Sequence, residues 1–301
     1  MKKKYILIFM LALVFISCSA VTMSPNNSEV TNPIDPSEPN YPAWSEIEPP
    51  LPVLNDEAIK YGIDISQEDN VIKEQIKIKL KEYKKEKGKY KVIFTGKPKD
   101  DYLVSASLSK LTLEVAKELS IGEATIDISN VYFNERKIKS RMFRGGVYLG
   151  YFNVNFILPE NIIRVIEGNS FSFLNNYLKE ITIPDSVIGI DAAAFQVDES
   201  IEKITFRETS KLEYIGDLAF SYAKVKEILI PASVTYLGES VFGDYVTTVT
   251  YLGTKPNAIK NNGNVFDGCA NLKTLIVPNA ENIDDPAWKK FLGGKFIEVR
   301  K

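Results

Sequence analysis

Apolar residues recur along the second half of the chain in a fixed phrase. Residues 180–195, EITIPDSVIGIDAAAF, match residues 227–242, EILIPASVTYLGESVF, in frame. In both, two apolar residues flank a third residue, a proline follows, and a phenylalanine closes the phrase. Such alternation predicts a short β-strand with its apolar residues on one side. A phrase that returns in frame indicates a repeat protein.

The repeats share one period at two independent landmarks. The apolar–x–apolar copies are IDIS at 126, FILP at 156, ITIP at 181, ITFR at 204, ILIP at 228, VTYL at 249 and LIVP at 275. The closing phenylalanines are spaced by 28, 24, 25, 22 and 24 residues. They are Phe143, Phe171, Phe195, Phe220, Phe242 and Phe266. Because one unit cannot bury its own apolar side, we expect the units to stack into a solenoid with a parallel sheet on one face.

The pattern also assigns a direction to each strand residue. Ile181 and Ile183 are expected to point into the solenoid and Thr182 outward, because successive side chains of a strand alternate. Gly216 is interpreted as the residue that permits the tight turn before the closing phenylalanine.

Two helices and two strands are predicted upstream of the repeats. A helix is expected from about residue 67 to 86, ended by Gly88, and a strand follows over 89–96. The next helix covers 103–120, and a strand over 124–129 opens the repeats. Strand, helix and strand in this order favour a right-handed parallel crossover. Residues 56–120 are therefore expected to form a helix–strand–helix cap before a solenoid over residues 121–301.

The first 17 residues have the pattern of a secretory signal. Lysines at 2–4 precede an apolar run over 5–16, which is shorter than the about 20 residues of a membrane span. Cys18 stands where bacterial lipoprotein signals place the acylated cysteine, with Phe15 and Ile16 resembling the looser boxes of spirochaete lipoproteins. The alternative is an ordinary secretory signal that is cut nearby and discards Cys18.

Residues 18–55 have the composition of a tether. Eight of the 15 prolines fall between residues 19 and 55. Such a segment buries too little apolar surface to fold and behaves as an extended linker. A linker after an acylated cysteine would hold a folded domain away from a bilayer.

Charge excludes one class of partner. The formal net charge is −2, so the chain lacks the basic footprint of a nucleic-acid-binding protein. Residues 71–91 hold nine lysines against three glutamates, which would suit an anionic surface. We favour a solvated helix face there, because apolar residues fall at helical spacing between the lysines: Ile72, Ile76, Leu80 and Tyr83.

Residue types argue against catalysis. The chain has no histidine, which removes the common catalytic triads and any histidine-ligated metal site. Cys269 is expected to be a small buried hydrophobe. The acidic pairs Asp100–Asp101 and Asp284–Asp285 suit turns and helix caps. No phosphate-binding glycine motif occurs, so we expect neither a cofactor nor a metal, and no enzyme.

The repeated phrase I-x-I-P-x-S-V-x-x-I-G-x-x-A-F resembles the leucine-rich repeats of the BspA-like family, which occur in surface proteins of spirochaetes and of oral and gut anaerobes. The resemblance covers residues 121–301 and implies an α/β leucine-rich repeat solenoid. Asp191 replaces a usual glycine, Arg207 replaces the proline, and the copy at 249 runs on before Phe266, so these copies should be locally irregular. The resemblance also implies that Trp288 seals the last coil.

Two functions are compatible with this resemblance. The first is an exported protein, anchored through Cys18 at the outer membrane or cell surface, whose repeats adhere to host matrix proteins or other cells. The second is a periplasmic structural lipoprotein that works with a partner in the bacterial envelope. Proteolysis of intact cells would separate them, because it cleaves only a surface-exposed domain.

The outward side chains of the sheet are the predicted partner-binding face. One such residue per strand is expected, stacked about 4.8 Å apart, without a single-sign field. The central row is Ile157, Thr182, Thr205, Leu229, Thr250 and Ile276, and the flanking row is Asn155, Glu180, Lys203, Glu227, Thr248 and Thr274. The alternative is a merely solvated sheet, in which threonine is favoured by its β propensity.

Overall fold

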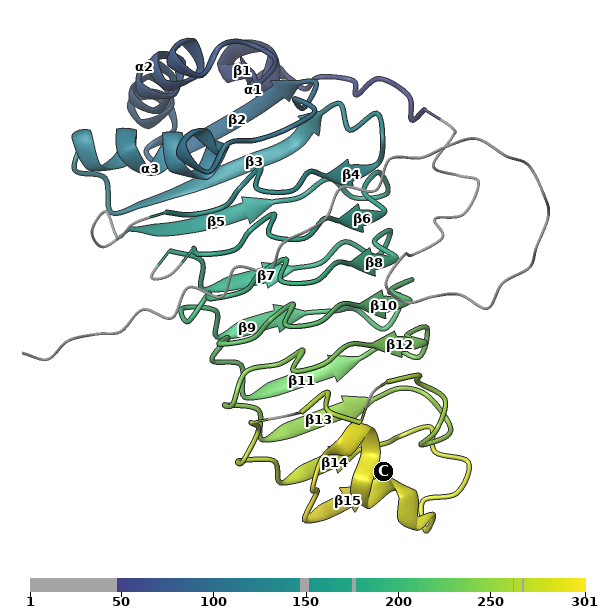
Figure 1. Ribbon diagram of the computed structural model, residues 1–301. Helices are drawn as coiled ribbons and strands as arrows, with labels where there is room; N and C mark the ends of the chain where they lie inside the picture. Colours follow the sequence, from purple (N-terminus) through teal and green to yellow (C-terminus); the bar gives the residue numbers. More distant parts are fainter. Residues whose placement is uncertain (1–47, 147–151, 175–176, 262, 267) are drawn as a thin grey trace, which may run out of the picture. The chain divides into compact units, whose positions relative to one another are not determined.

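The computed structural model describes residues 48–146, 152–174, 177–261, 263–266 and 268–301 (Figure 1). All of them fall in one compact unit, residues 43–301. The predicted signal peptide, Cys18 and most of the predicted tether lie outside the described residues. Among the described helices, none is long and apolar enough to cross a membrane.

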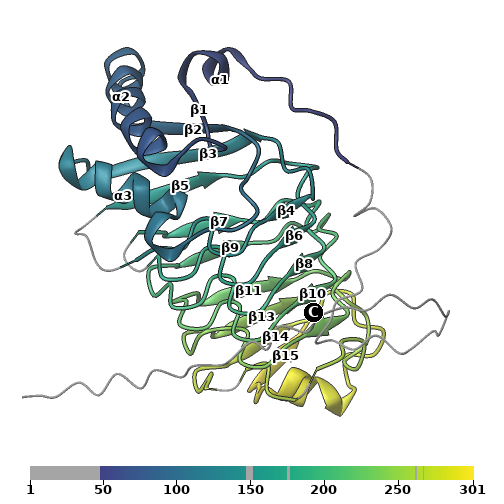
Figure 2. The ribbon, with the colours of Figure 1, turned by 45° about the horizontal axis from the view of Figure 1, so that its top comes forward.

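Helices and strands alternate at the amino-terminal end of this unit (Figure 2). Their order is α1 (Asp56–Tyr61), β1 (Gly62–Asp64), α2 (Asp69–Lys87), β2 (Lys91–Gly96), η2 (Val104–Ala106), α3 (Leu108–Glu118) and β3 (Glu123–Val131). The predicted helices and strands are all present, and β2 pairs with β3 in parallel as expected. The short α1 and β1 were not predicted; β1 adds a parallel strand beside β2.

Helix α2 is amphipathic, as its sequence predicts. It ends at Gly88, which adopts a left-handed conformation with φ 72°. Lys73 and Lys77 reach across to α3, at 2.8 Å from Glu114 and 3.0 Å from Glu118. The lysine-rich face is therefore a solvated and partly paired surface, and the apolar stripe beneath it is buried: Ile72, Ile76, Leu80 and Tyr83.

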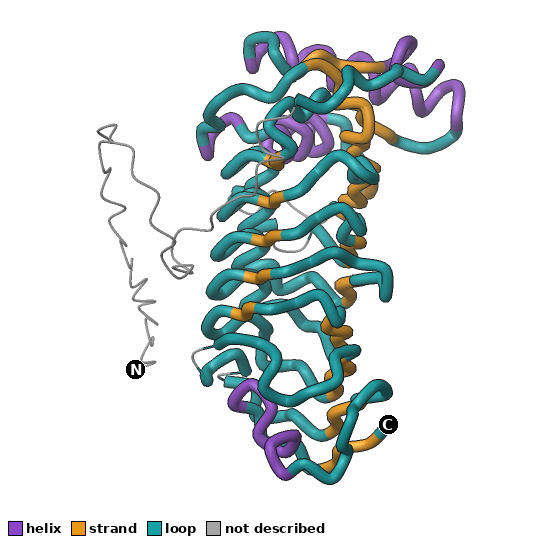
Figure 3. The backbone as a smooth tube through the Cα atoms, turned by 90° about the vertical axis from the view of Figure 1, so that its right-hand side faces the viewer, coloured by secondary structure: helices purple, strands orange, loops and turns teal. Residues whose placement is uncertain are grey.

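Downstream of the cap, the chain winds as a solenoid with a row of strands on each of two sides (Figure 3). The first row forms the strand face: β5 (Asn153–Ile157), β7 (Glu180–Thr182), β9 (Lys203–Thr205), β11 (Glu227–Ile230), β13 (Thr248–Tyr251), β14 (Thr274–Ile276) and β15 (Glu298–Arg300). The second row is one parallel sheet of two-residue strands: β4 (Lys137–Ile138), β6 (Val165–Ile166), β8 (Gly189–Ile190), β10 (Tyr214–Ile215) and β12 (Tyr236–Leu237). The α/β solenoid predicted from the repeats is confirmed.

The predicted side-chain directions are confirmed. In β7, Ile181 is 3% exposed and the following Ile183 is fully buried, whereas Thr182 is exposed. The closing phenylalanines stack through the core, with ring centroids 5.2, 4.8, 4.9, 6.4 and 5.7 Å apart in chain order. This ladder of rings joins each coil to the next.

Gly216 opens the expected turn, since its carbonyl oxygen accepts the Ala219 N–H at 3.4 Å, but the turn does not depend on a glycine backbone there. Its backbone is not left-handed; Leu218, two residues before the closing phenylalanine, is, with φ 59°. A Cβ on Gly216 would lie 2.5 Å from the backbone nitrogen of Ala192 in the preceding coil. Glycine is needed at 216 because two coils approach closely. The left-handed residue of the turn is not glycine in five successive coils: Arg141, Asn169, Ala193, Leu218 and Ser240.

The sheet of the strand face is not continuous, contrary to the evenly stacked row expected from the sequence. It consists of β1-β2-β3-β5, the pair β7-β9, and β11-β13-β14-β15. A single bridge, Val154 to Leu178, joins the first piece to the β7 coil. No ladder of hydrogen bonds joins β9 to β11 among the described residues.

Phe206 lies beside the break between β9 and β11. It is buried at the second inward position of its copy, where the copies at 181 and 228 have isoleucine, and its ring lies edge-on to Phe220 at 6.2 Å. The stacked rings of Phe220 and Phe242 stand 6.4 Å apart. The break therefore falls in the copy that Arg207 marked as irregular.

The carboxyl-terminal segment closes the last coil. In η3 (Pro286–Gly293), Trp288 is 1% exposed and its indole nitrogen donates to the Asn282 carbonyl oxygen at 2.9 Å. The ring lies 6.2 Å from that of Tyr251. The sealing role that the resemblance implied for Trp288 is confirmed, and Cys269 is buried as expected.

Candidate functional site

A groove of about 1090 Å³ lies in the strand face, beside the break between β9 and β11. Its lining comes from five strands, β9, β11, β13, β14 and β15, and from the segments that lead into them. The outward residues of the central row form its floor, and all four are half-buried: Thr205, Leu229, Thr250 and Ile276.

The groove brings together more than half of the predicted face. Seven of the twelve residues in the two predicted rows line it: Lys203, Thr205, Glu227, Leu229, Thr248, Thr250 and Ile276. The other five do not line it: Asn155 and Ile157 of β5, Glu180 and Thr182 of β7, and Thr274 of β14. Ile157 is 41% exposed, so its outward direction is as predicted although it stands outside the groove.

Sequence reasoning missed five polar lining residues, Glu202, Lys224, Lys226, Tyr245 and Arg300. Arg300 is the outward residue of β15, directly opposite Ile276 in the parallel register. The sequence carried a signal for it, because Val299 and Arg300 continue the apolar–outward pattern through FIEVRK. The other four precede their strands by one to three residues, and the two predicted rows did not extend that far.

Positive charge exceeds negative charge around the groove. Its basic side chains are Lys203, Lys224, Lys226 and Arg300, and its acidic ones are Glu202 and Glu227, a balance of four minus two, or +2. The whole chain carries −2. The two predicted rows carry charges of both signs, as the sequence indicated. Lys224 and Lys226 before β11 and Arg300 in β15 add positive charge and make the groove locally basic.

The break between β9 and β11 lies beside the groove. Strands β9 and β11 each have a hydrogen-bonded neighbour on their outer side, β7 and β13. Their facing edges have no ladder within the described chain. Unpaired strand edges offer N–H donors and C=O acceptors to another chain.

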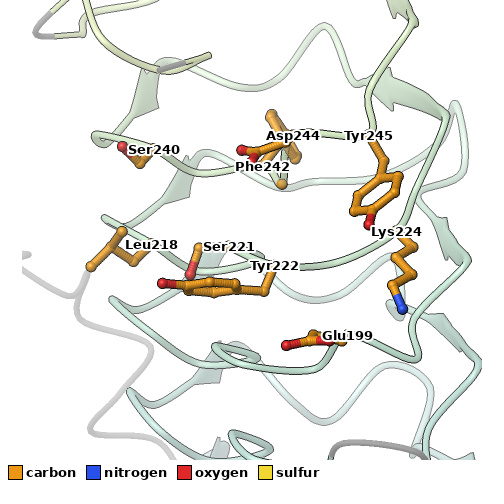
Figure 4. A pocket seen from close by; sticks show the side chains of 10 residues that line it. Glu199, Leu218, Ser221, Tyr222, Lys224, Ser240, Phe242, Asp244 and Tyr245 are labelled. Atoms are coloured by element: carbon orange, nitrogen blue, oxygen red, sulfur yellow. The ribbon is translucent and has the colours of Figure 1, made fainter. Parts of the chain in front are cut away.

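A second hollow of about 430 Å³ adjoins the groove (Figure 4). Lys224 and Tyr245 line both, and in Figure 4 they lie together at one end of the second hollow, with Ser240 at the other. Tyr245 is 47% exposed and Tyr222 is 57% exposed. The basic end of the groove therefore continues into a hollow edged by two accessible tyrosine rings.

The buried titratable groups lie away from this surface. Burial raises the pKa of Asp198 well above its usual value; one carboxylate oxygen accepts the Leu174 N–H and the other has no partner. In the cap, burial lowers the pKa of Lys91, but Asp127 at 2.7 Å and Glu57 at 3.1 Å outweigh it and the pKa is raised. Neither group lines the groove. Within the described ranges, no three histidine, cysteine, aspartate or glutamate side chains are placed to hold a metal.

Comparison with known proteins identifies the repeats. Residues 165–291 match the BspA type leucine rich repeat region in six copies. A leucine-rich repeat protein of T. pallidum is 20% identical over 59% of this chain and 86% of its own, with a TM-score of 0.41. One from Bacteroides ovatus is 20% identical over 59% and 62%, with a TM-score of 0.23. No curated protein matches in sequence.

Leucine-rich repeat domains generally bind proteins and generally serve as scaffolds rather than enzymes. The period, the solenoid with its parallel strand face and the six matched copies agree. Residues 165–291 of this chain are therefore BspA-type leucine-rich repeats.

Proposed function

We propose that this chain is an exported, lipid-anchored binding protein that holds a partner protein against the groove of its strand face. The observation that carries the proposal is the groove itself, where seven of the twelve residues chosen from the repeat pattern converge. Its floor alternates apolar Leu229 and Ile276 with threonines. An apolar centre with a charged rim is the usual arrangement of a protein-binding surface.

Export and anchoring are supported by the sequence. A lysine cluster, a short apolar run and Cys18 follow one another, and the proline-rich segment to residue 55 would space the repeats from the bilayer. Lipidation at Cys18 would place the protein at the outer membrane or cell surface. A host matrix protein or a neighbouring cell is then the favoured partner, with a partner in the bacterial envelope as the alternative.

Catalysis is not part of the proposal. The chain has no histidine. The two carboxylates of the groove, Glu202 and Glu227, stand among four basic side chains, with no buried acid placed between them in the lining. These charged side chains are suited to binding another protein rather than to acid–base catalysis.

A triple substitution tests the site. Thr205→Glu, Leu229→Glu and Thr250→Glu place three carboxylates on the groove floor, on side chains that point outward, so circular dichroism should show an intact fold. Partners recovered on the parent chain from host extracellular matrix, and separately from envelope extract, should be lost. The matched control puts three glutamates on exposed positions outside the groove: Ala232, Thr235 and Thr254. Equal binding by the groove variant and the control would overturn the assignment.

A further inference from the structure

We infer that the groove takes an extended, acidic segment of a partner protein, laid across strands β9 to β15. This rests on the proposed function, because it names the kind of partner that the same surface would bind. Three properties of the groove lead to it: its charge, its length and the chemistry of its floor.

The basic side chains are available to a ligand. Lys224 and Lys226 have no carboxylate within 4.0 Å in the part of the chain that the structure describes. Lys203 lies 3.9 Å from Glu180, and both side chains are more than 60% exposed. Such exposed pairs contribute little, so an incoming carboxylate can replace Glu180 at small cost.

Arg300, at the far end of the groove, is also available to a ligand. Within the described residues, Arg300 pairs with Glu298, two residues before it, at 3.7 Å, and both side chains are more than half exposed. Through β11, β13, β14 and β15 the register places Leu229, Thr250, Ile276 and Arg300 side by side. Cationic groups therefore stand at both ends of a floor that carries no charge.

The dimensions suit an extended chain. Neighbouring strands lie about 4.8 Å apart, so the run from β9 to β15 spans about 20 Å. About six extended residues, at about 3.3 Å each, cover that distance. Leu229 and Ile276 offer contacts to apolar side chains of such a segment.

The same charges argue against a nucleic acid. Glu202 and Glu227 stand among the cations and leave a balance of only +2. Nucleic-acid affinity depends on many phosphate contacts from clustered basic groups, and carboxylates in the groove would repel the backbone. A segment with two or three carboxylates matches the balance of +2, and its one or two apolar residues suit Leu229 and Ile276.

The test is selection from a random peptide library of about ten residues, displayed on phage, against the immobilised full chain in mild detergent. Two variants are selected in parallel. Lys224→Glu with Lys226→Glu reverses the basic end of the groove. Lys211→Glu with Lys289→Glu makes the same change in net charge at exposed lysines that do not line it.

The parent and the control should enrich peptides that are more acidic than the library. Synthesised copies should bind the groove variant about tenfold or more weakly, and salt raised from about 0.05 to 0.5 M should weaken binding to the parent. Neutral or basic sequences, no enrichment on the parent, or equal binding to the groove variant would each overturn the inference.

Two outcomes separate this inference from the proposed function. Neutral peptides that bind the parent but not the Thr205, Leu229, Thr250 triple variant would leave the groove as a protein site and refute an acidic occupant. Concentration-dependent self-association in sedimentation, abolished by Lys224→Glu with Lys226→Glu, would identify a second copy of the chain as the occupant and refute an acidic segment of a different partner.

Discussion

Removing one ring from the phenylalanine ladder should show how the coils are held together. Phe195 is fully buried and lies between Phe171 and Phe220, at 4.8 and 4.9 Å, with interplanar angles of 4° and 12°. Phe242 is also buried, at 3% exposure, but its stacked neighbours stand 6.4 and 5.7 Å away. Phe195 and Phe242 occupy the same position of the repeat, but the neighbouring rings are closer to Phe195 than to Phe242.

The expected magnitudes follow from these distances. A buried phenylalanine truncated to alanine loses transfer free energy and leaves a cavity, together about 3–5 kcal/mol. Closely packed aromatic pairs add about 0.5–1.5 kcal/mol beyond buried area. Phe195→Ala should therefore cost about 5 kcal/mol of unfolding free energy, and Phe242→Ala about 3 kcal/mol.

Guanidinium titration followed by far-ultraviolet circular dichroism and by tryptophan fluorescence measures both losses. The two probes must give coincident transitions, because repeat arrays can unfold in parts. Lys226→Ala, on an exposed side chain, should change stability by less than about 0.5 kcal/mol. Equal losses from Phe195→Ala and Phe242→Ala, or a larger loss from the latter, would refute ring packing as the source of cohesion between coils.

Three further substitutions test separate parts of the structure. The raised pKa of buried Asp198 means that the folded parent loses stability as pH rises above about 4, the ordinary pKa of aspartate. Asp198→Asn removes this loss, so the variant should become more stable relative to the parent as pH rises. Parallel pH–stability curves for the two proteins would contradict this. Gly216→Ala should cost about 1–3 kcal/mol through its contact with the Ala192 backbone, whereas Gly122→Ala, with open space around the new Cβ, should cost almost nothing; similar denaturation midpoints would contradict it. Cys18→Ala should abolish palmitate labelling and detergent partitioning, and unchanged labelling would remove the lipid anchor from the proposal.

The repeat pattern was sufficient to predict the solenoid because its landmarks are packing positions. Phe171, Phe195 and Phe220 recur because each must stack on the ring of the next coil, and the alternation in ITIP assigned the inward and outward sides. The helix stop at Gly88 was equally local, since a left-handed residue there is the common end of a helix.

The groove could not be predicted in the same way, because it arises where copies differ. Replacing isoleucine by Phe206 leaves the apolar pattern intact, and only the packing of two coils shows that the strands separate there. Lys224 and Tyr245 lie outside the aligned core and reach the groove through the path of the loops. Leu218 has a left-handed backbone that its residue type does not indicate.

The most direct test of the strand-face site is lysine footprinting of the chain bound to a partner recovered from the matrix or envelope extracts. Acetylation rates are compared by mass spectrometry with and without the partner. Binding in the groove predicts protection of Lys203, Lys224 and Lys226, with unchanged rates at Lys81, Lys85 and Lys289, which are exposed outside it. Protection of the α2 lysines with unchanged rates at Lys203, Lys224 and Lys226 would contradict the account.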